Sequence, residues 1–151
     1  MQGDRIRYRS GYRFQLVNDY RVQTSILPGF DVETEFVELN CAGILTIRHG
    51  YAWDGPSDPI IWFMPKFIRK YLLRKFMRGS LVHDALAGLM RDYYIGRFAW
   101  FTAINRELKK ICIEDGMWRV RAWAIFVGVE HLGGKSWVKW GGGGKELCDA
   151  P

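Results

Sequence analysis

The sequence predicts an α+β domain in which a small, mostly antiparallel N-terminal β-sheet packs against three to four C-terminal helices. Three observations support this fold class. Apolar and polar residues alternate through much of residues 5–53, which is the period of half-buried strands. Residues 53–59 combine glycine, proline, serine and aspartate, the residues typical of turns. Beyond residue 66, apolar residues recur every three to four positions, as they do along one side of a helix.

The alternating region divides into short strands separated by turn residues. We predict strands near residues 5–9, 12–16, 20–24, 35–39 and 44–48. Ser10 and Gly11 separate the first two strands, which predicts a hairpin. Pro28 and Gly29 mark another turn. We therefore expect these strands to form one small sheet.

The second half of the chain divides into helices in the same way. We predict helices over residues 66–78, 80–94, 97–114 and 117–132. Ser80 is the predicted N-cap of the second helix, so that His83 and Asp84 would lie in its first turn. The four glycines at residues 141–144 predict a flexible arm. We expect a single domain over residues 1–140 and a glycine-rich tail over residues 141–151.

The composition favours a binding protein made in a reducing compartment. Lysine and arginine total 22 against 16 acids, and the resulting charge of +6 indicates an anionic partner. Aromatic residues form 15% of the chain, more than one small core holds, and surface tyrosine and tryptophan are typical of interfaces. The three cysteines, Cys41, Cys112 and Cys148, lack CxxC spacing, so we expect neither a disulfide framework nor a cysteine-rich zinc site. We also expect no signal peptide and no transmembrane segment.

Two short segments carry the most specific pattern. Residues 50–57 read Gly-Tyr-Ala-Trp-Asp-Gly-Pro-Ser, and residues 81–86 read Leu-Val-His-Asp-Ala-Leu. The chain resembles domain-of-unknown-function family 1353, which occurs in phages and prophages, over roughly residues 40–137. The residues that carry the resemblance are Gly50, Trp53, Asp54, Gly55 and Ser57 in the loop and His83, Asp84 and Leu86 in the helix, with Gly133 and Trp137 matching loosely. The resemblance implies strands, this loop and then helices, but no established activity.

The matched residues allow two interpretations. In the first, Asp54, His83 and Asp84 bind a metal or act as acid and base in a small hydrolase, for which the cell wall is one candidate substrate. An Asp–His contact orients the imidazole and raises its basicity, as this chemistry requires. In the second, they form a structural network with the motif residues Trp53, Gly55 and Ser57. There Asp54 and Ser57 cap a turn or the helix, His83 bonds to that loop, and Asp84 stabilises a positive helix end. We favour the network, because the chain contains no HExxH, HxH or GxSxG motif, and we expect no metal and no cofactor.

The most unusual segment, residues 65–79, combines cations and aromatic residues without a single acid. Its cations are Lys66, Arg69, Lys70, Arg74, Lys75 and Arg78. The apolar residues between them predict an amphipathic helix. Three interpretations stay open: a solvated basic surface, a surface for an acidic protein or nucleic-acid phosphates, and a helix lying in a membrane interface. Trp137 and Trp140, interleaved with lysines, predict a second partner-binding segment in the tail.

These observations together predict a bacteriophage virion-associated structural protein, a minor component of the head, neck or tail. We expect it to act by assembling with other virion proteins in multiple copies rather than by catalysis. Its expected location is the virion, after synthesis in the host cytoplasm. Contact with nucleic acid through the basic segment is a further expectation.

Overall fold

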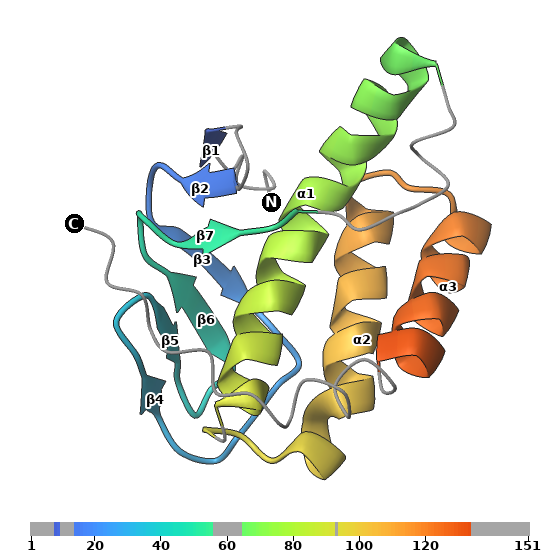
Figure 1. Cartoon of the computed structure of the whole chain (residues 1–151). Coiled ribbons are helices and arrows are strands. Elements are labelled where there is room, and N and C mark those ends of the chain that lie inside the picture. The colour runs from blue at the N-terminus through green and yellow to red at the C-terminus, as the bar shows by residue number, and fades with distance from the viewer. Residues whose placement is uncertain (1–7, 10–13, 56–64, 93, 134–151) are drawn as a thin grey trace.

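Two small antiparallel sheets and three helices make up the part of the chain that the computed structural model describes, residues 8–9, 14–55, 65–92 and 94–133 (Figure 1). The strands are β1 (Tyr8–Arg9), β2 (Phe14–Leu16), β3 (Tyr20–Gln23), β4 (Val32–Glu33), β5 (Val37–Leu39), β6 (Ile44–Ile47) and β7 (Ala52–Trp53). The helices are α1 (Lys66–Arg91), α2 (Arg97–Glu114) and α3 (Arg119–Gly128), which runs into a π-helical turn, η2 (Val129–Gly133). The predicted α+β class is confirmed.

The strands pair within two sheets rather than the single sheet predicted. The expected hairpin is present, because β1 pairs antiparallel with β2, and β7 then pairs with the other edge of β2. The second sheet has the order β3-β6-β5-β4, and all of its pairs are antiparallel. A bend after Leu16 turns β3 away from β2. Alternation identifies strands but not their partners, which is why the sequence did not reveal this division.

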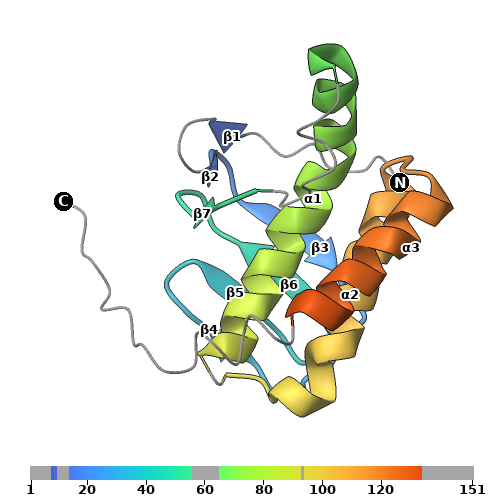
Figure 2. The ribbon, with the colours of Figure 1, turned by 45° about the vertical axis from the view of Figure 1, so that its right-hand side comes forward.

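Helix α1 is one continuous helix, so the prediction of separate helices over 66–78 and 80–94 is wrong. Gly79 lies inside α1 and does not end a helix. It is the point at which α1 approaches α2 closely, where a larger residue would not fit. Ser80 is buried in the middle of the helix, and its Oγ donates a hydrogen bond to the Met77 carbonyl at 2.9 Å. The first turns of α1 extend past the strands and the other helices (Figures 1 and 2). His83 and Asp84 therefore lie well inside a helix and not in its first turn.

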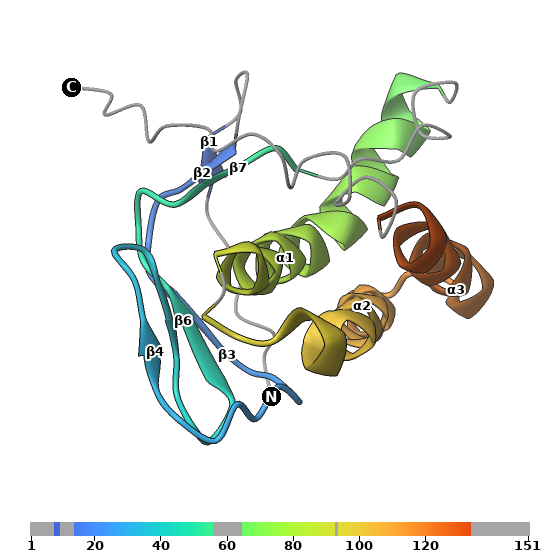
Figure 3. The ribbon, with the colours of Figure 1, turned by 60° about the horizontal axis from the view of Figure 1, so that its bottom comes forward.

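The core lies between the four-stranded sheet and α1. Leu39, Leu45 and Ile47 are fully buried on the inner side of that sheet and share one core with Leu81 and Leu86 of α1. Helix α2 packs on α1, and α3 lies on the side of α2 away from the sheet (Figure 3). No helix in the described ranges combines the length and hydropathy required to cross a bilayer.

Gly79 provides a test of the α1–α2 contact. A Cβ at this position would lie 2.9 Å from Cys112 Sγ and 3.1 Å from Leu108 Cδ1. We expect Gly79→Ala to lower the free energy of unfolding, because overpacking of about 1–3 kcal/mol outweighs the helix-propensity gain of about 1 kcal/mol. The matched control is Gly88→Ala in the same helix, where the nearest atom, Arg91 Nη2, is at 3.6 Å. Urea unfolding should show opposite signs for the two variants; stabilisation by both would contradict this packing.

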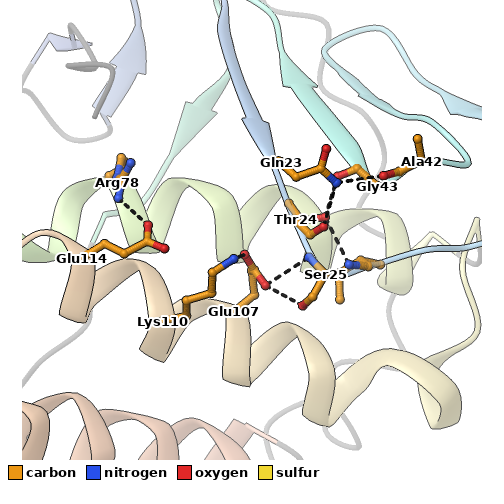
Figure 4. A network of polar contacts seen from close by, with 10 residues as sticks. Gln23, Thr24, Ser25, Ala42, Gly43, Arg78, Glu107, Lys110 and Glu114 are labelled. Carbon is orange, nitrogen blue, oxygen red and sulfur yellow. Dashed lines mark hydrogen bonds and ion pairs between the residues drawn. The ribbon is translucent and has the colours of Figure 1, made fainter. Parts of the chain in front are cut away.

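A buried carboxylate joins the end of β3 to α2. Glu107 is only 1% exposed, and it accepts hydrogen bonds from the Ser25 amide at 3.2 Å and from the Ser25 hydroxyl at 2.6 Å (Figure 4). Lys110 Nζ approaches the other carboxylate oxygen at 3.0 Å. Because a buried charge needs such partners, this cluster holds α2 in register with the sheet.

Candidate functional site

The Trp-Asp-Gly segment connects the first sheet to α1. Trp53 is buried, its ring lies 5.6 Å from the ring of Phe14, and its Nε1 donates to Ser80 Oγ at 3.2 Å. Gly55 has a φ of +78°, and its backbone packs against the Phe14 ring. Asp54 is exposed between these two buried residues. Trp53 and Gly55 therefore have structural roles, while Ser57 lies outside the described residues.

His83 belongs to a polar network that links α1, α2 and η2. Its Nε2 lies 2.8 Å from Oδ1 of Asn105, a residue of α2 that is 1% exposed. Asn105 Nδ2 donates to Glu130 Oε2 at 2.7 Å, and Thr102 Oγ1 donates to Glu130 Oε1 at 2.5 Å. Because Glu130 accepts from the amide nitrogen, Asn105 presents its oxygen to His83, and His83 Nε2 must carry the proton. The predicted hydrogen bond from His83 to the loop is therefore wrong, because His83 bonds to Asn105 of α2 instead.

The charges of Asp84 and Asp54 both act on the phenol of Tyr51. Burial raises the pKa of Tyr51, and the negative charges of Asp84 and Asp54 raise it further. Asp84 Oδ1 is 3.7 Å from His83 Nδ1, beyond hydrogen-bond length. The predicted stabilisation of a helix N-terminus by Asp84 is wrong, because α1 begins at Lys66. No cluster of three or more His, Cys, Asp or Glu side chains suited to a metal occurs within the described ranges.

The network predicts that His83 contributes to stability. We expect His83→Ala to lower the free energy of unfolding by about 1–3 kcal/mol, because the buried Asn105 oxygen loses its donor. His83→Gln should recover part of this loss, since a glutamine amide can donate to the same oxygen. His49→Ala, which removes an exposed imidazole paired with Asp19, is the control and should change stability by less than ~1 kcal/mol. Equal losses for His83→Ala and His49→Ala in urea unfolding would contradict the network.

The structure divides the six predicted partner-binding cations of α1 into two groups. Arg78 is 13% exposed and forms ion pairs of 3.0 Å with Glu114 and with Asp115. Lys75 Nζ donates to the Gly116 carbonyl at 2.8 Å and lies 4.6 Å from the centre of the Tyr71 ring. These two cations bind the end of α2 and have an internal role. The other four, Lys66, Arg69, Lys70 and Arg74, line a pocket of about 440 Å³ together with Phe14, Leu73 and Met77.

A second surface was not predicted from the sequence. Trp118, Val120 and Trp123, at the beginning of α3, are 84%, 78% and 57% exposed. Val120 and Trp123 line a hollow of about 310 Å³ with Lys109, Ile113 and Arg119. We call these six residues the α3 surface. The high tryptophan content was the available signal, but a tryptophan at helical spacing is as compatible with a core as with a surface. Trp137 and Trp140 of the tail lie outside the described residues.

Scans of protein families, curated proteins and solved structures found no match to this chain. The resemblance to family 1353 therefore stays a prediction that rests on the loop and helix residues themselves.

Proposed function

We propose that the protein is a structural component of a bacteriophage particle, a minor protein of the head, neck or tail. It acts by binding neighbouring virion proteins in multiple copies. The phage setting rests on the resemblance of residues 50–57 and 81–86 to family 1353. The mode of action rests on one observation, the exposed aromatic α3 surface.

The α3 surface has the composition of a protein interface. Single exposed apolar side chains are ordinary, but Trp118, Val120 and Trp123 lie close together in the chain, and two of them line one hollow. Tryptophan and arginine are the residues that most often dominate the energy of interfaces. Arg119 and Lys109 add cations at this hollow. A neighbouring protein with an apolar protrusion and an acidic rim would match it.

Incorporation into particles tests this proposal. The double variant Trp118→Ser, Trp123→Ser should enter phage particles about tenfold less than the original protein, because two interface side chains are lost. The control is Phe98→Ser, which removes an aromatic side chain more exposed than either tryptophan, near the opposite end of α2. Quantitative mass spectrometry of purified particles gives the copy number of each variant. Normal incorporation of the double variant, with its folding intact, would contradict assembly through the α3 surface.

The alternative function is a small hydrolase that uses Asp54, His83 and Asp84. The observation in its favour is that the negative charges of Asp54 and Asp84 both raise the pKa of the buried Tyr51 phenol, so that the loop motif and the helix motif act on one group. This alternative predicts a lytic activity that His83→Gln abolishes while the protein stays folded. The assembly proposal predicts that His83→Gln enters particles normally.

A further inference from the structure

The four cations at the beginning of α1 occupy one side of the helix. Lys66, Arg69, Lys70 and Arg74 follow the spacing i, i+3, i+4 and i+8, which spans about 12 Å along the helix axis. We call this set, with the Phe14, Leu73 and Met77 side chains that line the same pocket, the α1 pocket. Lys66, Lys70 and Arg74 are exposed, whereas Arg69 is half-buried.

No interaction within the described residues explains the charges of Lys66, Lys70 and Arg74. Lys66 and Lys70, and Lys70 and Arg74, are like-charge pairs at i, i+4, which destabilise a helix. Cations in the first turns also oppose the helix dipole, and α1 has no acid in its first turn. Within the described residues, Lys66, Lys70 and Arg74 have no carboxylate partner, in contrast to Arg78 one turn further along. A bound anion would relieve this repulsion.

The apolar side chains that line the α1 pocket indicate which class of anion it binds. Phe14 is partly buried, and its contact with Trp53 fixes the ring that lines the pocket. An aromatic ring beside a row of cations is the arrangement on which single-stranded nucleic acids bind, with bases stacked and phosphates paired. An acidic peptide would pair its carboxylates with the cations but carries no nucleobase to stack on the Phe14 ring. A membrane surface is flat, and the exposed aromatic residues that it would need, Phe67 and Tyr71, do not line this pocket.

We propose that the α1 pocket binds single-stranded nucleic acid. Phosphates pair with Lys66, Lys70 and Arg74, the half-buried Arg69 adds positive charge beside them, and one base contacts the ring of Phe14. This site goes beyond the proposed structural role, because it uses neither the α3 surface nor a protein partner. It adds a contact between the protein and a nucleic-acid strand.

Fluorescence anisotropy with a labelled oligothymidylate of about 15 nucleotides tests the site. Three phosphate contacts predict a slope of about −2.1 for log affinity against log salt concentration. The variant Lys70→Glu, Arg74→Glu should bind at least about tenfold more weakly and with a shallower slope. The control is Arg21→Glu, Arg106→Glu, which changes the net charge equally at two exposed positions on β3 and α2 and should change affinity less than about threefold. Phe14→Leu should weaken binding while leaving the salt slope unchanged, because it removes stacking and no charge.

Three results would overturn the proposal. The first is equal weakening by the two charge-reversal pairs, which would indicate only a net-charge effect. The second is tighter binding to a duplex of the same length with no effect of Phe14→Leu, which would indicate backbone contact alone. The third is the absence of oligonucleotide binding at low salt, whether or not vesicles containing phosphatidylserine are bound. Circular dichroism confirms that each variant is folded. Loss of oligonucleotide binding with normal particle incorporation would separate this site from the proposed function.

Discussion

Trp53→Ala is expected to lower the free energy of unfolding by about 3–5 kcal/mol, the largest effect of any substitution considered for this protein. The Trp53 ring is buried against Phe14, and its Nε1 donates to Ser80 in the middle of α1. Removing the side chain leaves a cavity where the three-stranded sheet meets the helix. Urea unfolding followed by circular dichroism measures the change.

Two control variants separate the contribution of the buried Trp53 ring from that of its hydrogen bond to Ser80 and from the general effect of removing a tryptophan. Trp53→Phe keeps much of the ring but removes the donor to Ser80, so we expect a smaller loss of about 1–2 kcal/mol. Trp118→Ala removes a tryptophan that is 84% exposed and should change stability by less than ~0.5 kcal/mol. A Trp53→Ala loss no greater than that of Trp118→Ala would show that the motif tryptophan does not hold the sheet to α1.

Gly55→Ala is expected to be the second most damaging change, with a loss of about 2–5 kcal/mol. Two effects combine at this position. A φ of +78° costs an alanine about 1–2 kcal/mol, and the new Cβ would lie 2.3 Å from Cε2 of Phe14, which adds about 1–3 kcal/mol of overpacking. The Phe14 ring cannot move freely, because it packs against Trp53.

Gly29 isolates the backbone component. It has a φ of +82°, but a Cβ there would meet no atom within 4 Å. Gly29→Ala should therefore lose only about 1–2 kcal/mol, the energy of the left-handed conformation. The difference between the two variants in urea unfolding gives the energy of the contact with Phe14. No difference would mean that Gly55 is required only for its backbone conformation.

Features set by neighbouring residues were predictable from the sequence, and features set by distant contacts were not. Helix α2 (Arg97–Glu114) has the predicted bounds, because Gly96 and the Asp115-Gly116 pair mark its ends locally. Helix α1 was divided wrongly at Gly79, since a glycine that normally interrupts a helix here allows close packing on α2. A glycine is the local signal at both Gly96 and Gly79, and only the contact of Gly79 with α2 distinguishes the two positions.

The candidate site shows the same limit. The sequence singled out His83 but assigned its hydrogen bond to the loop, because nothing local indicates that Asn105, 22 residues away, is its partner. The network continues to Glu130 in the π-helical turn, where the sequence predicted an uninterrupted helix. Likewise, the six cations of α1 look equivalent in the sequence, yet Arg78 pairs with Glu114 and Asp115 from another helix. Burial and pairing between distant segments decide these roles.

The copy number of this protein in purified phage particles tests the central claim most directly. Quantitative mass spectrometry against the major coat protein gives that number. Assembly through the α3 surface predicts a fixed, small number of copies per particle, as in a ring of the neck or tail. Absence from the particles, with abundance in infected cells, would contradict a structural role.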